Sequence, residues 1–233
     1  MISTTMAKII HILPDKIVKL VSKKVVDRYL KKYATIRIDG SENLELIKTP
    51  TLFICNHLSN ADGLVLDKVL KEINPTFVAG VKLSDNVVTN IGINIVKTTT
   101  IKPNSVDNEG IKKIINLVRH GESLLMFPEG TRSREGSLIE AKKGIILIAK
   151  MTGAPIVPIG LYGTENLLPI NEEGDMGAEQ FNHAEVHINI GKQFKMPRRA
   201  ENQNKKTYLE FATKHVMMKI SDLLPEDYRG FYK

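Results

Sequence analysis

Short apolar segments alternate with helical patterns along most of this 233-residue chain, and this alternation limits the folds that it can adopt. The apolar segments lie at residues 36–38, 51–55, 76–79, 123–127, 156–161 and 185–190. Patterns with helical spacing lie at residues 62–73, 86–96, 106–120, 140–152 and 201–223. Such alternation predicts an α/β fold with a mostly parallel or mixed central sheet flanked by helices.

Two polar runs stand directly after two of the predicted strands. The run Asn-His-Leu-Ser-Asn-Ala-Asp occupies residues 56–62, and the run Phe-Pro-Glu-Gly-Thr-Arg occupies residues 127–132. In open α/β sheets, ligands bind in the crevice outside the carboxyl ends of the strands. The two runs therefore predict a single site, in which His57 and Asp62 form an acid–base pair that faces an anion-binding loop.

Both runs match the motifs of a known family, in the same order and at similar spacing. They make the chain resemble the glycerophospholipid acyltransferases of the 1-acylglycerol-3-phosphate acyltransferase type, over roughly residues 35–225. The resemblance implies the same α/β fold and no cofactor. It also implies transfer of a fatty acyl group from acyl-CoA or acyl carrier protein to the free hydroxyl of 1-acyl-glycerol-3-phosphate. The product would be phosphatidic acid, made for phospholipid synthesis.

His57 and Asp62 are the expected catalytic residues, because a hydroxyl needs a base before it can attack a thioester at neutral pH. Neutral histidine suits this work, and a carboxylate on its other ring nitrogen would fix the tautomer and stabilise the imidazolium. No Gly-x-Ser-x-Gly run occurs, so we expect direct transfer without an acyl-enzyme. The alternatives are a core or capping histidine and an aspartate that only caps a helix.

The second run supplies groups that suit a phosphate. Gly130 lets the backbone approach a ligand, Thr131 offers a hydroxyl and an amide, and Arg132 offers a planar fork. Glu129 could accept a hydrogen bond from the acceptor hydroxyl or orient Arg132, and the residues alone do not decide between these roles. The alternative is a polar loop in which Glu129 and Arg132 simply form a pair.

Two further family motifs are matched less well. In the middle block Lys82 stands at the first basic position, and Lys102 stands where the family has an arginine, so the bidentate fork is missing. The strand around Val157, Pro158 and Ile159 resembles the wall of the family's acyl pocket. The altered block leaves another lysophospholipid or glycerol-3-phosphate open as acceptor. A thioesterase and a non-catalytic lipid- or anion-binding relative are further alternatives.

The net charge of +7 and the pI of about 9.3 favour anionic partners. The chain has no tryptophan and no run that resembles a nucleic-acid-binding motif, so we expect lipid or phosphate partners and no nucleic acid.

The single cysteine, Cys55, is expected to be a small buried side chain in a reducing compartment. The scattered histidines lack the spacing of metal ligands, so no metal site is expected.

Residues 1–34 are expected to form a membrane-association segment ahead of an acyltransferase domain at residues 35–233. A helix from about Asp15 to Tyr33 carries an apolar stripe (Ile17, Val18, Val21, Val25 and Tyr29) among seven basic residues. Such a basic amphipathic helix is typical of an anionic membrane surface. We therefore expect a peripheral protein on the cytoplasmic face of the cell membrane. The alternative is a helix that packs its stripe on the core and leaves a solvated basic face.

Overall fold

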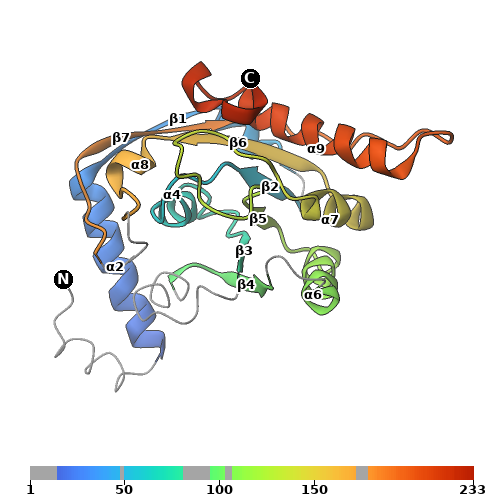
Figure 1. Cartoon of the computed structure of the whole chain (residues 1–233). Coiled ribbons are helices and arrows are strands. Elements are labelled where there is room, and N and C mark those ends of the chain that lie inside the picture. Colours follow the sequence, from blue (N-terminus) through green and yellow to red (C-terminus); the bar gives the residue numbers. More distant parts are fainter. Residues whose placement is uncertain (1–14, 48–49, 81–94, 103–106, 172–177) are drawn as a thin grey trace.

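The computed structural model of the chain describes residues 15–47, 50–80, 95–102, 107–171 and 178–233. Within them a seven-stranded sheet has the order β1-β7-β6-β2-β5-β3-β4 (Figure 1). The strands are β1 (Ala34–Asp39), β2 (Leu52–Cys55), β3 (Thr76–Gly80), β4 (Thr98–Ile101), β5 (Leu124–Met126), β6 (Ile156–Tyr162) and β7 (Ala184–Ile190). Strands β2 to β6 run parallel, whereas β7 is antiparallel to β6 and parallel to β1. The predicted mixed sheet is confirmed.

Helices cover both faces of this sheet (Figure 1). The described helices are α2 (Asp15–Tyr33), α3 (Glu42–Glu45), α4 (Asp62–Val69), α6 (Asn108–Arg119), α7 (Gly144–Thr152), α8 (Thr164–Leu167) and α9 (Lys205–Ser221), with 3₁₀ turns η2 (Glu226–Tyr228) and η3 (Gly230–Tyr232). Buried residues of α6, α7 and α9 pack together on one face, and those of α2, α4 and α8 pack on the other. The architecture is therefore three-layered.

The apolar runs reflect burial on both faces of the sheet. In β2, Leu52 and Ile54 face the layer of α6, α7 and α9, whereas Phe53 and Cys55 face the layer of α2 and α4. All four side chains have 0% exposure. A strand buried on both faces reads as a continuous apolar run, and burying each large side chain contributes about 1.5–3 kcal/mol.

The predicted strands are present, and the differences concern one edge strand and some boundaries. Strand β4 was not among the predicted strands, because its threonines give no apolar run at the edge of the sheet. The helices predicted at 62–73, 140–152 and 201–223 are shorter by two to four residues at one or both ends. The helix predicted at 86–96 lies outside the described residues, apart from its last two positions.

Helix α2 has a core-facing side and an exposed apolar side. Leu30 is fully buried against the sheet, with Val26 and Tyr33 half-buried beside it. The predicted stripe lies on another side of the helix, and Val21 and Val25 remain 50% and 48% exposed. The helix therefore packs on the core through Leu30, and the membrane role of its exposed stripe stays a prediction. Within the described part of the chain, none of the helices has the length and apolar character needed to cross a bilayer.

A buried amide joins the carboxyl ends of β2 and β6. The side chain of Asn56 donates through Nδ2 to Leu161 O at 2.7 Å and accepts through Oδ1 from Leu161 N at 2.8 Å. It thereby extends the hydrogen-bond ladder between the two strands by one residue beyond the end of β2.

We predict that Asn56→Ala lowers the free energy of unfolding by about 2–4 kcal/mol, because both polar backbone groups of Leu161 lose a buried partner. Urea denaturation measures the change. Asn166→Ala is the matched control. The exposed Asn166 side chain donates to the neighbouring Glu165, so its loss should change stability by less than about 0.5 kcal/mol. Equal stability of the two variants would show that the hydrogen bonds between Asn56 and Leu161 do not stabilise the fold.

Candidate active site

His57 and Asp62 form the hydrogen-bonded pair that the sequence predicts. His57 follows the end of β2, and its Nδ1 lies 2.7 Å from Asp62 Oδ2. Because an ionised carboxylate only accepts hydrogen bonds, Nδ1 carries the proton in this contact, and a neutral ring then keeps its lone pair on Nε2. The side chain of His57 retains 21% exposure, whereas that of Asp62 has none. The pair can therefore accept a proton from a group outside the protein.

Asp62 is the first residue of α4, but its carboxylate points back to the preceding loop. Oδ2 accepts hydrogen bonds from Leu58 N at 2.7 Å and Ser59 N at 2.9 Å, in addition to His57. Ala61 stands at the N-cap of α4 and makes no side-chain cap. The interpretation of Asp62 as a simple helix cap is wrong. Its Oδ1 is buried without a hydrogen-bond partner among the described residues. The three hydrogen bonds of this carboxylate are all accepted by Oδ2.

The loop after β5 holds the backbone of His57 on both sides. His57 N donates to Glu129 Oε1 at 2.8 Å, and His57 O accepts from Ser133 N at 2.7 Å. The imidazole also stacks on Phe127, with ring centres 4.0 Å apart and planes inclined by 15°. Backbone and ring are thus both positioned by the second motif, which is possible because β2 and β5 are neighbours in the sheet.

Glu129 is a buried link between two loops. Its second carboxylate oxygen accepts from Ile139 N at 3.0 Å, and the residue is only 1% exposed. Burial raises the pKa of Glu129 to about 7, against the lowering effect of its two backbone hydrogen bonds. It makes no ion pair with Arg132 among the described residues, so the alternative of a simple Glu129–Arg132 pair is wrong.

The groups expected to bind an anion lie on the exposed side of this loop. Gly130 and Thr131 are exposed, and Gly130 has a φ of +71°, which favours glycine. A Cβ at Gly130 would also approach Lys142 Cγ to 3.1 Å. Arg132 is 18% exposed, and its Nη1 lies 3.3 Å from Oε1 of Glu179, whose other oxygen accepts from Asn60 Nδ2 at 2.6 Å. Glu179 thus connects the two motifs.

The remaining predicted site residues are Lys82, Lys102 and the three residues of β6. Lys82 lies outside the described residues. Lys102 follows β4, which is three strand spacings, or about 14 Å, across the sheet from β2. Its backbone N donates to Asp107. In β6, Val157 and Ile159 are core side chains with no exposure, so the acyl-pocket role of this strand stays a prediction.

Pro158 stands in the middle of the sheet, where its missing N–H needs an explanation. Ile156 pairs with Phe194, and Ile159 pairs with Ile190. Two residues of β6 therefore lie between these pairs, opposite three residues of the neighbouring segment. This extra residue is a bulge, which interrupts the ladder and tolerates a residue without a donor.

Sequence reasoning missed Glu179 and gave no role to Phe127 or Asn60. Phe127 and Asn60 stand inside the two motifs, and their position there was the available signal. Glu179 lies in a segment without periodicity or motif, so only the fold reveals its contact with Arg132.

Cys55 is buried as expected, and burial raises the pKa of its thiol, which disfavours a thiolate nucleophile. No group of potential metal ligands occurs among the residues that the structure describes.

Known proteins resemble this chain in sequence over most of the sheet. The family model described as Acyltransferase matches residues 35–162. A chloroplastic 1-acyl-sn-glycerol-3-phosphate acyltransferase of Brassica napus is 35% identical over 158 residues, which are 66% of this chain and 44% of that protein. Its Arabidopsis thaliana counterpart is 34% identical over 160 residues, or 67% and 43% of the two chains. The chain thus spans less than half the length of these plant relatives.

A solved structure has the same fold. The crystal structure of the 1-acyl-sn-glycerophosphate acyltransferase PlsC from Thermotoga maritima superposes with a TM-score of 0.62 at 21% sequence identity. The superposition covers 90% of this chain and 79% of that one, so the likeness concerns the fold of most of the chain.

We predict that Glu129 makes the stability of the protein depend on pH. Its carboxyl has a pKa of about 7 in the folded protein and an ordinary value of 4.5. Between these values the folded state binds more protons than the unfolded state, so raising the pH through this window should cost about 3 kcal/mol. Urea denaturation at pH 5 and pH 8 should show this loss in the wild type and not in Glu129→Gln. Parallel pH profiles of the two proteins would contradict the prediction.

Proposed function

Because the chain belongs to the acyltransferase family, we propose that it transfers a fatty acyl group from a thioester donor to the free hydroxyl of 1-acyl-glycerol-3-phosphate, forming phosphatidic acid. The hydrogen-bonded pair of His57 and Asp62 beside the loop at 127–132 carries this proposal. The matched region contains both motifs. The activity named for the plant and Thermotoga relatives supports the choice of acceptor.

In the proposed reaction, Nε2 of His57 accepts the proton of the acceptor hydroxyl while the hydroxyl oxygen attacks the thioester carbonyl carbon. Asp62 keeps the proton on Nδ1 and stabilises the imidazolium that forms. The carbon–sulfur bond then breaks, and the departing thiolate takes the proton from the imidazolium. The ester is formed directly on the acceptor, and the histidine returns to its neutral state.

The exposed groups at 130–132 would bind the phosphate of the acceptor. A guanidinium has five N–H donors, and Glu179 accepts from Nη1 alone. Arg132 therefore retains donors for phosphate oxygens, together with the amide and the hydroxyl of Thr131, whereas the amide of Gly130 donates to Phe127 O at 3.0 Å. Glu129 would act on the substrate indirectly, by fixing the backbones of His57 and Ile139.

We predict that purified protein in detergent forms phosphatidic acid from 1-acyl-glycerol-3-phosphate and either palmitoyl-CoA or palmitoyl acyl carrier protein. His57→Ala should abolish turnover, because it removes the base. Asp62→Asn should lower kcat by about 10³- to 10⁴-fold with a small change in KM, since it stabilises the wrong tautomer. Turnover by His57→Ala at the wild-type rate would refute the assigned base.

The same assay distinguishes the alternative functions. Turnover only with another lysophospholipid or with glycerol-3-phosphate would keep the chemistry and change the acceptor. Release of free fatty acid without an ester product would indicate a thioesterase. Lipid binding that is equal in wild type and His57→Ala, with no product from either, would indicate a non-catalytic binding protein.

We also propose that residues 1–34 hold the enzyme at an anionic membrane surface, so that it can take its acceptor from the bilayer. The exposed stripe of α2 supports this assignment, because Ile17, Val21, Val25 and Tyr29 present contiguous apolar surface between basic residues. The association would be peripheral.

We predict that Val21→Asn/Val25→Asn weakens binding to phosphatidylglycerol vesicles about tenfold or more, because two half-exposed valines lose their burial in the acyl boundary. Vesicle cosedimentation measures the partition. Leu147→Asn/Met151→Asn on α7 is the matched control, with side chains 41% and 48% exposed. An equal loss in both double variants would show that the stripe of α2 has no special role.

A further inference from the structure

A cleft with a volume of about 630 Å³ lies between α2 and α4, outside the candidate active site. Its lining includes three apolar side chains, Val26, Leu64 and Ile95, of which Ile95 is fully buried. Among the residues that the structure describes, the charged lining side chains are the cations Lys23, Lys24, Arg28, Lys31, Lys68 and Lys71 and the carboxylates Asp27 and Asp67. These described residues combine apolar surface with a charge of +4.

Two ion pairs cross the cleft and account for both carboxylates. Lys23 Nζ lies 3.2 Å from Asp67 Oδ2, and Lys68 Nζ lies 3.8 Å from Asp27 Oδ1. Each pair joins α2 to α4, so the two helices present their basic residues from opposite walls. The remaining cations make no ion pair with a carboxylate of the described residues; they are Lys24, Arg28 and Lys31 on α2 and Lys71 just after α4. Four positive charges are thus left for an anionic ligand.

The unpaired cations of α2 adjoin its exposed apolar stripe. Lys24, Arg28 and Lys31 follow one another at helical spacing, and the stripe of Val21, Val25 and Tyr29 lies about 90° further round the helix. A ligand that contacts both the row of cations and the apolar stripe must be anionic at one end and apolar at the other. A phospholipid of the membrane surface has this character, with a phosphate for the cations and acyl chains for the stripe.

We propose that the α2–α4 cleft binds the phosphate headgroup of an anionic membrane phospholipid, at a site separate from the acceptor site at Arg132. This inference rests on the proposed membrane association of residues 1–34 and gives it a defined headgroup site. The lipid bound in the cleft is part of the membrane and is not consumed in the reaction. Cations from both walls contact its phosphate, while the apolar surface of Val26 and Leu64 contacts its glycerol backbone.

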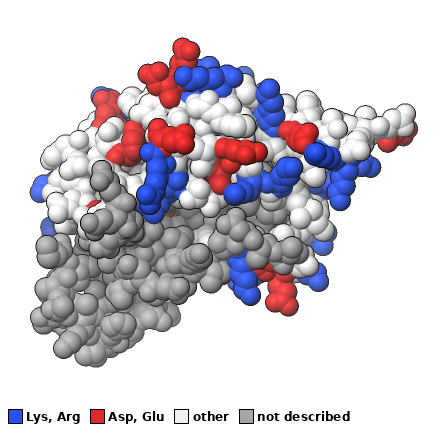
Figure 2. All heavy atoms as spheres, in the orientation of Figure 1, with Lys and Arg blue, Asp and Glu red and all other residues white. Residues whose placement is uncertain are grey.

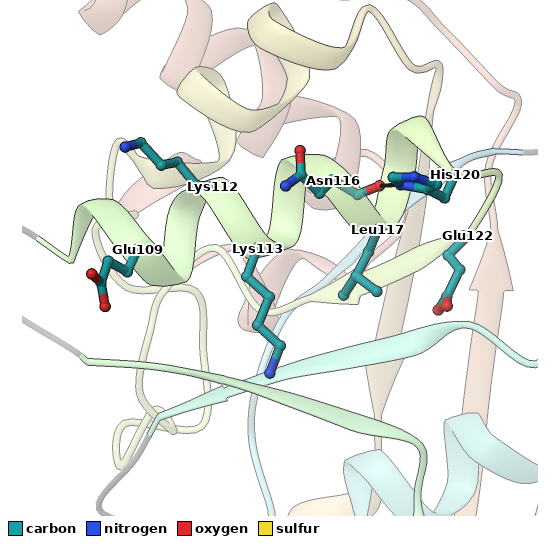
Figure 3. A pocket seen from close by; sticks show the side chains of 7 residues that line it. All are labelled: Glu109, Lys112, Lys113, Asn116, Leu117, His120 and Glu122. Carbon is teal, nitrogen blue, oxygen red and sulfur yellow. Dashed lines mark hydrogen bonds between the residues drawn. The ribbon is translucent and has the colours of Figure 1, made fainter.

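The overall charge of the protein does not by itself locate such a site. Figure 2 shows basic and acidic side chains interspersed over the face that it displays. A second hollow lies along α6, where Lys112 and Asn116 point to one side of the helix and Lys113 and Leu117 point to the other (Figure 3). Two carboxylates, Glu109 and Glu122, balance its lysines. The α6 hollow therefore lacks the charge excess of the α2–α4 cleft and provides a control.

The test compares two charge reversals of equal size in the full chain. Lys31→Glu/Lys71→Glu removes one unpaired cation from each wall of the cleft, and Lys112→Glu/Lys113→Glu makes the same change in net charge on α6. All four lysines are exposed and make no ion pair with the described residues, so both variants should fold, which thermal melts can verify. Cosedimentation measures binding to phosphatidylcholine vesicles with and without phosphatidylglycerol, and calorimetry measures binding of soluble dihexanoyl phosphatidylglycerol.

We expect the cleft variant to bind phosphatidylglycerol vesicles about tenfold or more weakly than the α6 variant. The wild type and the α6 variant should bind the short-chain lipid saturably, and the cleft variant should not. Equal losses in both variants would show diffuse attraction and overturn the proposal. Unchanged vesicle binding with a raised KM for acyl carrier protein would also overturn it, by identifying the cleft as a protein-docking site.

The failure of this proposal can be told apart from that of the proposed function. Vesicle and short-chain lipid binding need no turnover, whereas the acyltransferase assay in detergent needs no vesicle. A wild type that binds through the cleft and forms no ester would therefore refute the activity and leave the cleft assignment intact.

Discussion

The candidate site depends on the two hydrogen bonds that fix the backbone of His57. Its N–H is bound by the buried carboxylate of Glu129 and its carbonyl by the amide of Ser133, so both come from the loop after β5. With the backbone held there, Asp62 needs only to close one short hydrogen bond to set the orientation of the ring. The proposed reaction needs His57 to be held in one position, because a misplacement of about 1 Å can lower a rate about 100-fold. Main-chain and side-chain contacts both hold it here.

The C-terminal residues support the same loop from outside the sheet. Leu138 N donates to Tyr228 O, Phe231 N donates to Leu138 O, and Ala141 N donates to the hydroxyl of Tyr232. The supported segment includes Ile139, whose amide binds Glu129. A chain of hydrogen bonds therefore connects residues 228–232 to the backbone of His57, and these residues support the structure of the loop.

Helix α2 joins the core to a surface with a different character. Leu30 anchors it beside the sheet, and the ion pairs to α4 join it to that helix, while Val21 and Val25 face outward. Exposed apolar patches of this kind often mark interaction sites, and the proposed membrane surface would cover this stripe. The membrane proposal starts from the exposed apolar stripe of α2. The headgroup site starts from the unpaired cations of the same helix.

The sequence by itself determined the α/β class, most strands and the pairing of His57 with Asp62 beside the loop at 127–132, because local period and short motifs encode them. It did not reveal β4, whose threonines lie at a half-exposed edge, or the partner of Arg132, because Glu179 lies 47 residues further along the chain. It also left the role of Glu129 open. Only the tertiary structure shows these features. For Glu129 the reason is the pairing of β2 with β5, which brings residues 56–62 and 127–133 together. Contacts across such distances depend on which strands are neighbours, and no local pattern records that order.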